Sequence, residues 1–285
     1  RIIGHRHQPE RPQGCYQPEA WVGKSPQSVL PQRHAPKMDP MMNADLHCHS
    51  VVSDGTLTPE ALAERARANG VELWALTDHD EVGGQHRAAA AAKAVGMKYL
   101  TGTEISVTFA DITVHIVGLG FDPDHPALVQ GLKRTRGGRE ERAREMADGL
   151  AKVGIHGAFD GALQYVGNPE LISRTHFARH LVESGVCRDT NEVFRKFLTE
   201  GKPGFVPHRW AQLGDAVRWI TEAGGLAVIA HPARYDHNPT REYALFTEFK
   251  AHGGRGVEVV TGSHTAAEYV KYADMAIEFG LAASR

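Results

Sequence analysis

Short apolar runs alternate with amphipathic helical patterns from Met42 onward. This alternation is typical of a mainly parallel sheet whose strands are connected by helices, and it predicts an α/β fold, either a barrel or a doubly wound sheet. We expect strands at the apolar runs Ala44–Cys48, Glu72–Thr77, Lys98–Thr101, Ile112–Leu119, Leu226–Ala230, Gly256–Val260 and from Leu281 onward.

Helix signals are clearest after the first strand. Thr58 is expected as the N-cap, Pro59 as the first helical residue and Gly70 as the C-terminal stop. The alanine-rich run 85–95 predicts a second helix. Residues 105–112 are too few for a crossover helix, so the third and fourth strands are predicted to form a hairpin.

Strand patterns are missing between Asp122 and Pro207, where helices are predicted around 134–153, 175–184 and 191–200. The charged run Arg139–Arg142 is interpreted as a solvated helix face with paired charges. The domains expected are a disordered leader or mis-extended start at 1–41, a barrel at 42–121 and 207–285 with an incomplete C-terminus, and a helical insertion at 122–206 that contributes to the substrate site.

Composition narrows the partners that are expected. The chain has 285 residues, of which 41% are hydrophobic and 23% charged, as in a globular protein. The net charge of −2 argues against duplex DNA and favours a small or short ligand. Scattered cysteines and the lack of a long apolar run predict a cytoplasmic protein with no membrane span, and no obligate protein partner is evident.

Seventeen histidines direct attention to metal binding, and several of them follow predicted strands. His47 and His49 point to the same face at the end of the first strand and can share a metal. His79 follows the second strand in Thr-Asp-His-Asp, and Glu104 ends the third, where it is expected to bridge metals. Alone, the His-x-His pair is equally explained by two polar side chains at a strand end.

Three further residues extend this set. Asp54 precedes the first helix, where it either caps a turn or binds a cation. His115 lies within the fourth strand and, taken alone, resembles a hydrogen-bonded core histidine. His231 closes the fifth strand before a proline. Asp78 or Asp80 is expected to orient a ligating imidazole.

The insertion and the segment after it supply candidates for substrate binding. Arg174 is expected to clamp a phosphate beside His176, while Lys202, His208 and Arg209 add positive charge. Next to them, the Trp210 indole offers a face for a nucleobase or packs against the following helix.

The motifs D-L-H-C-H-S, S-D-G, T-D-H-D, G-T-E, H-I-V-G-L-G, N-P-E-L-I-S-R-T-H-F and A-H-P together resemble the PHP (polymerase and histidinol phosphatase) superfamily. The insertion and V-P-H-R-W resemble its branch of 3′,5′-nucleoside bisphosphate phosphatases and of the 5′→3′ exoribonuclease RNase AM. The resemblance implies a distorted (β/α)7 TIM-like barrel, and a metal-activated water that attacks the phosphomonoester of a small nucleotide or of 5′-phosphorylated, short single-stranded RNA.

The resemblance also implies two or three divalent metals, with Mn²⁺ first and Fe²⁺, Zn²⁺ or Mg²⁺ as alternatives. One metal is assigned to His47, His49 and Glu104. Glu104 bridges to a second, held by His115 and either His176 or His231, and Asp54 and His79 belong to a third. Glu104, Arg174 and His231 are taken as catalytic, and an acid/imidazole pair that family members carry after their final strand is expected beyond Arg285.

Two other functions fit the same residues. One keeps the site but changes the substrate to another small phosphate ester such as histidinol phosphate. The other is a degraded, non-catalytic barrel, for which fewer than two metals per chain are expected.

Overall fold

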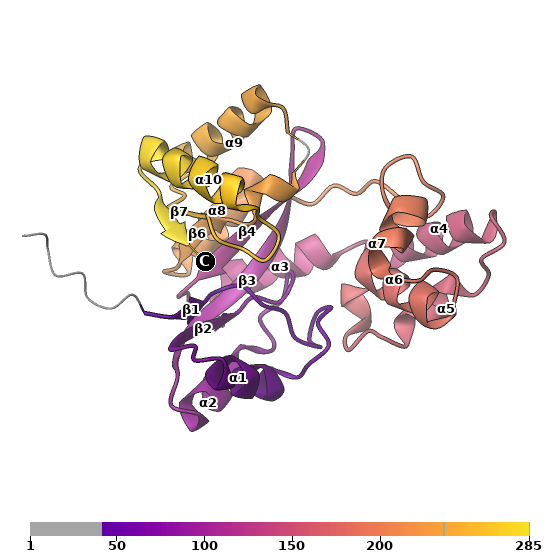
Figure 1. The fold of residues 1–285 in the computed structure, drawn as a ribbon, viewed down its shortest axis with the longest axis horizontal. Helices are drawn as coiled ribbons and strands as arrows, with labels where there is room; N and C mark the ends of the chain where they lie inside the picture. The colour runs from indigo at the N-terminus through magenta and orange to yellow at the C-terminus, as the bar shows by residue number, and fades with distance from the viewer. Residues whose placement is uncertain (1–41, 236, 285) are drawn as a thin grey trace, which may run out of the picture. The chain divides into compact units, whose positions relative to one another are not determined.

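The computed structural model describes residues 42–235 and 237–284, and the leader predicted at 1–41 lies outside them. The strands form one curled sheet in the order β1-β2-β3-β4-β6-β7-β8, drawn in Figure 1. They are β1 (Ala44–Asp45), β2 (Leu73–Leu76), β3 (Lys98–Phe109), β4 (Ile112–Leu119), β6 (Leu226–Ile229), β7 (Gly256–Glu258) and β8 (Ala282–Ser284), and the short β5 (Ala211–Gln212) pairs with β3.

The sheet is mixed, with antiparallel pairing at β4. β1, β2 and β3 are parallel, as are β6, β7 and β8, while β4 is antiparallel to both of its neighbours. The predicted hairpin of the third and fourth strands is confirmed, because β3 and β4 are antiparallel neighbours. Pairing with β4 extends β3 to Phe109, beyond the expected end at Thr101. Since β1 and β8 are at the two ends of the strand order, a closed barrel stays a prediction.

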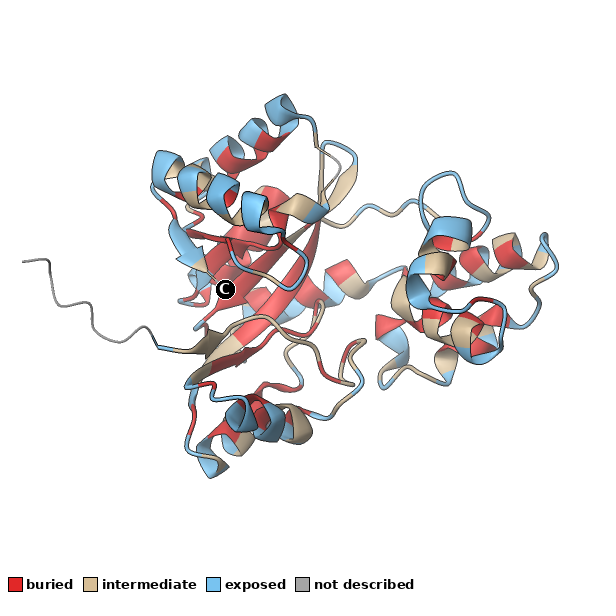
Figure 2. Ribbon diagram, viewed as in Figure 1, coloured by how far each residue is buried: buried red, intermediate tan, exposed pale blue. Residues whose placement is uncertain are grey.

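Helices cover the outside of the sheet, so its central strands are buried, whereas β8 at its edge is largely exposed, as Figure 2 shows. α1 (Pro59–Ala68) begins as predicted, because the Thr58 side chain accepts a hydrogen bond from the Ala61 amide. α1 and α2 (Gln85–Ala94) present small alanines to Trp74 of β2. Within the described residues, no helix has the length and apolar character needed to cross a membrane.

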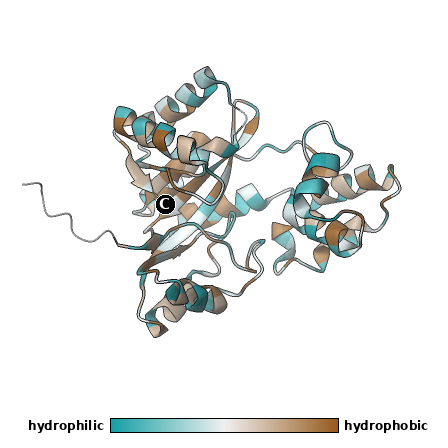
Figure 3. Cartoon of the chain, viewed as in Figure 1, coloured by the Kyte–Doolittle hydropathy of each residue, from teal (hydrophilic) through white to brown (hydrophobic). Residues whose placement is uncertain are grey.

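The largest core lies on the other half of the sheet. It joins β3, β4, β6 and β7 to α8 (Leu213–Glu222), α9 (Pro239–Ala251) and α10 (Ala266–Phe279). α3 (Pro126–Arg136) belongs to this core, because Leu128 and Leu132 pack with Trp219 and Ile220. Apolar residues are concentrated in the strands, whereas the helices mix both kinds, as Figure 3 shows.

A second core holds together the helices between α3 and β5. They are α4 (Arg139–Ala151), α5 (Ala158–Leu163), η1 (Pro169–Leu171), α6 (Arg174–Glu183), α7 (Thr190–Val193) and the π-helical turn η2 (Phe194–Leu198). The single helix predicted at 134–153 is wrong. Gly137 and Gly138 separate α3 from α4, and Gly138 has a φ of 81°, a left-handed conformation that favours glycine.

Candidate metal centre

A single buried carboxylate lies at the centre of the strand-end histidines. Glu104 is 1% exposed and lies on β3, beyond the last residue of β2. Its carboxylate oxygens are close to five imidazole nitrogens: Nε2 of His47 (3.3 Å) and His49 (3.3 Å), Nδ1 of His79 (3.0 Å) and His115 (2.9 Å), and Nε2 of His231 (2.8 Å). Residues predicted from separate motifs are therefore brought together by the fold.

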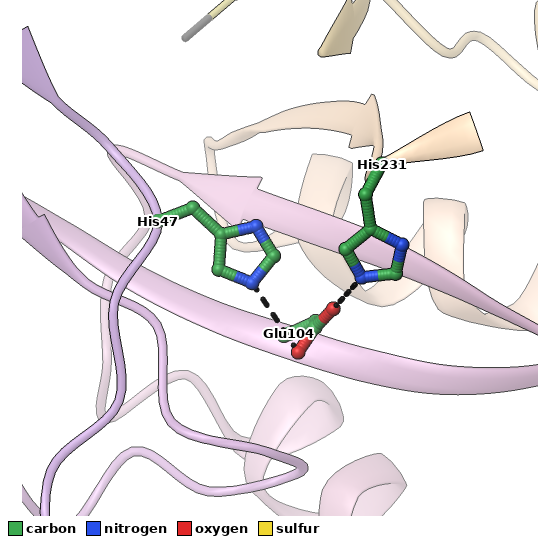
Figure 4. A group of neighbouring side chains, drawn as sticks. All are labelled: His47, Glu104 and His231. Carbon is green, nitrogen blue, oxygen red and sulfur yellow. Dashed lines mark hydrogen bonds and ion pairs between the residues drawn. The ribbon is translucent and has the colours of Figure 1, made fainter. Parts of the chain in front are cut away.

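The cluster contains two overlapping groups with the geometry of cation sites. His47 and His231 approach different oxygens of the Glu104 carboxylate, as Figure 4 shows, and His49 and His79 form the other group with the same carboxylate. In each group the candidate ligand atoms lie within 4.8 Å of one another. Imidazole nitrogen and carboxylate oxygen are donors that Mn²⁺, Fe²⁺ and Zn²⁺ accept.

Electrostatics in the cluster fit a cation. Burial would raise the pKa of Glu104, but the surrounding His115, His79 and His47 lower it well below its usual range. For His79 burial has the opposite effect and opposes protonation, yet Glu104 and Asp54 raise its pKa to about 9. Without a metal, Glu104 and Asp54 thus favour the protonated, positively charged form of His79 between them. A divalent cation would supply the same positive charge, so the residues fit the implied metals.

The predicted ligands are not all equivalent. Asp54 is at the edge of the cluster, with an oxygen 3.9 Å from Nε2 of His79. Burial raises the pKa of Asp54, but the effects of His79, His49 and His176 bring it down to about 2, so this carboxylate is ionised. Asp54 therefore extends the site towards α6, where His176 lies.

His176 presents a donor rather than a lone pair. The Ser173 amide donates to its Nδ1 at 3.0 Å at the start of α6. A neutral His176 ring then carries its proton on Nε2, which is buried and close to the Ser53 backbone. This geometry favours His231 over His176 as the ligand beside Glu104 and His115, an alternative that the sequence left open.

Sequence reasoning missed Glu258, which orients two members of the cluster. Glu258 ends β7 and is 1% exposed. One of its oxygens accepts from Nδ1 of His47 at 2.6 Å, and the other accepts from the His231 amide at 2.6 Å. This leaves the Nε2 lone pair of His47 for a metal. The signal was available, because Glu258 is an acid within the predicted strand Gly256–Val260, and an acid at a strand that is hard to explain by packing is what singled out Glu104.

Glu258→Gln is expected to weaken metal binding by about 10- to 100-fold, because a neutral amide supports His47 less well and leaves the unusual His231 backbone, with a φ of 24°, less firmly held. Titration calorimetry with Mn²⁺ measures this change. The exposed Glu145→Gln serves as the matched control. Equal metal affinity in Glu258→Gln and the control would contradict the orienting role.

The two aspartates around His79 bind groups other than imidazoles, so the expectation that one of them hydrogen-bonds a ligating histidine is wrong. Asp78 accepts from the Ser50 amide and hydroxyl and from the Ser53 hydroxyl, each at 2.7 Å. Asp78 thereby fixes the loop that carries Asp54. Asp80 binds serine and arginine groups on its far side.

Three arginines lie together beside the cluster, and we call Arg139, Arg142 and Arg174 the arginine group. Arg139 and Arg142 are 5% and 8% exposed, so the interpretation of the run 139–142 as a solvated face is wrong for its arginines, although its two glutamates are exposed. Burial and then Arg174 and Arg139 lower the pKa of Arg142 to about 10, and burial and Arg139 lower that of Arg174. Arg139 forms an ion pair with Asp80, the one carboxylate among the described residues that pairs with the arginine group. Three buried or half-buried cations with a single paired carboxylate favour the binding of an anion.

Of the other residues predicted to bind substrate, only some lie near the cluster and the arginine group. His208 packs on Trp210. Burial and then the nearby Arg142 and Arg139 lower the pKa of His208 to about 4, so it lies next to the arginine group. Lys202 and Arg209 are exposed, and no contact brings either to the cluster within the described residues. Arg139 lies 4.5 Å over the ring of Trp210, so this ring supports an arginine on one face.

Comparison with known proteins agrees with this geometry. The PHP domain family model matches residues 45–131. A 3′,5′-nucleoside bisphosphate phosphatase of Chromobacterium violaceum is 56% identical over 244 residues, which is 86% of each chain. A 5′-3′ exoribonuclease of Haemophilus influenzae is 42% identical, over 84% of this chain and 87% of its own.

A solved structure gives the same result for the fold. A putative metal-dependent phosphoesterase of Bifidobacterium adolescentis superposes with a TM-score of 0.77 at 28% identity, covering 86% of both chains. The similarity therefore extends over the strands of the curled sheet and the helices between them, beyond the segment that the family model matches.

Proposed function

This chain belongs to the PHP domain family and is a metal-dependent phosphate ester hydrolase, and we propose that it removes one phosphomonoester from 3′,5′-nucleoside bisphosphates. The observation that supports a substrate with two phosphates is the pairing of a metal-ligand cluster with the arginine group. The cluster is suited to the phosphate that reacts. The arginine group is suited to the one that stays.

The cluster residues would hold two or three metals, with Glu104 shared between them. His47 and His231 would form one group with Glu104, His49 and His79 the other, and Asp54 and His115 would complete the set. When bound, the metals supply a water of lowered pKa, about 7, and charge neutralisation of the phosphoryl oxygens. Mn²⁺ is the metal we propose to test first, because the donors are nitrogen and oxygen without thiolate.

The chain's own residues position the substrate and stabilise its charge. Arg174 lies half-buried at the start of α6, with Nη1 3.4 Å from the Leu198 carbonyl, and its remaining donors suit phosphate oxygens. His176, two residues later on α6, lies close enough to Asp54 to lower its pKa, so α6 adjoins both the cluster and the arginine group. These roles assign the helical residues between α3 and β5 to the substrate site.

Phosphate release tests the proposal. Purified protein with Mn²⁺ is expected to release inorganic phosphate from a 3′,5′-nucleoside bisphosphate, and to do so with a higher kcat/KM than from histidinol phosphate. His49→Ala, which removes a candidate ligand, is expected to lose the activity, while the exposed His156→Ala should keep it. No release, or equal release by His49→Ala, would rule the proposal out.

A second substrate, 5′-phosphorylated short RNA, is favoured by one comparison, the 5′-3′ exoribonuclease that shares 42% identity. Release of mononucleotides from such an RNA, followed by chromatography, separates this activity from phosphate release. The cluster and the arginine group would serve both, since each substrate carries two phosphate groups on one nucleotide.

A further inference from the structure

Asp80 is fully buried directly after His79, in an unusual backbone conformation. It is 0% exposed and has a φ of 50°, which non-glycine residues rarely adopt. Such a conformation persists only when the surroundings hold it, and it is frequent beside functional residues. Here the proposed function assigns no role to Asp80.

One side of Asp80 is fixed to the strand that carries Glu104. The Asp80 amide donates to the Glu104 carbonyl at 2.9 Å. Its carboxylate accepts from the Ser106 amide at 2.7 Å and from the Ser106 hydroxyl at 2.9 Å. Asp80 is therefore fixed to β3 at Glu104, the central residue of the metal-ligand cluster, and at Ser106, two residues further along the strand.

The other side of Asp80 is fixed to the helices that carry the arginine group. The carboxylate forms an ion pair with Arg139, whose side chain is 5% exposed, and the Asp80 carbonyl accepts from Arg136 at 2.7 Å. These two arginines lie on either side of the break at Gly137 and Gly138, where α3 ends and α4 begins. A break with two glycines leaves the backbone free to turn, so the bonds to Asp80 define how α4 is placed.

We propose that Asp80 is a positioning residue that fixes the separation between the metal-ligand cluster and the arginine group, and thereby selects substrates with two phosphates. This inference rests on the proposed function. The ion pair is buried on both sides, so loss of its charge leaves Arg139 without a counter-ion and free to reorient. The substrate's second phosphate then meets the arginine group at an altered distance from the reacting phosphate.

Asp80→Asn tests the inference, with the exposed Asp148→Asn on α4 as the matched control. The kcat/KM is measured for a 3′,5′-nucleoside bisphosphate and for p-nitrophenyl phosphate, which has one phosphate. We expect the ratio of the two values to fall about tenfold or more in Asp80→Asn, mainly through KM of the bisphosphate, and to stay constant in the control. Equal losses on both substrates would overturn the inference, since a purely structural role predicts them.

Arg139→Gln gives a second test that does not depend on the folding of Asp80→Asn, and the double variant gives a third where thermal unfolding shows that Asp80→Asn is folded. Arg139→Gln should lower the same ratio, and adding Asp80→Asn should lower it little further, because the two residues act through one ion pair. Fully additive losses would contradict this. A wild-type protein that shows no preference for the bisphosphate would refute the proposed function instead, so the two failures are distinguishable.

Discussion

Glu104→Gln is expected to lower phosphate release by roughly a thousandfold or more, the largest effect of any single change that we foresee. The carboxylate touches imidazoles of both groups that fit a cation, so its loss removes a shared charged ligand. The glutamine side chain has nearly the same volume and leaves the packing of β3 intact. The effect should therefore appear in the metal content and in kcat rather than in stability alone.

Metal analysis by mass spectrometry and kinetics with a bisphosphate measure this result. Glu145→Gln, an exposed change of the same kind on α4, is the control and should bind as much metal as the wild type. If Glu104→Gln retains full metal content and activity, the assignment of Glu104 as the central ligand is wrong.

Arg174→Gln is expected to raise KM for a bisphosphate by roughly 100-fold, because the phosphate that does not react loses a charged, forked donor. A smaller change is expected with p-nitrophenyl phosphate, which has no second phosphate for the arginine group. Steady-state kinetics on both substrates separate these effects.

Arg144→Gln provides the matched control for Arg174→Gln. Arg144 is exposed and pairs with Glu140 on the surface of α4, so its replacement removes the same charge far from any proposed contact with substrate. If the two variants have the same kinetics, the arginine group does not bind the second phosphate.

Local sequence pattern determined the strands and most of the cluster. Each predicted strand is present, because an apolar run bounded by turn residues has few other stable conformations in a packed sheet. The ends of neighbouring strands meet at one rim, so His47, His79, Glu104 and His231 could be grouped without knowing the fold. Their convergence on one carboxylate follows from that geometry.

Only the tertiary structure decided which charged residues are buried and what they bind. His47 and Glu258 are 211 residues apart, and Asp80 and Arg139 are 59 apart. A charged residue leaves water only when a distant partner compensates it, and no local pattern encodes that partner. For this reason Arg139 and Arg142 resembled a solvated helix face, although they lie buried beside the site. The sequence by itself thus determined the sheet and the ligands on its rim, whereas the fold decided how those ligands are oriented and where an anion would bind.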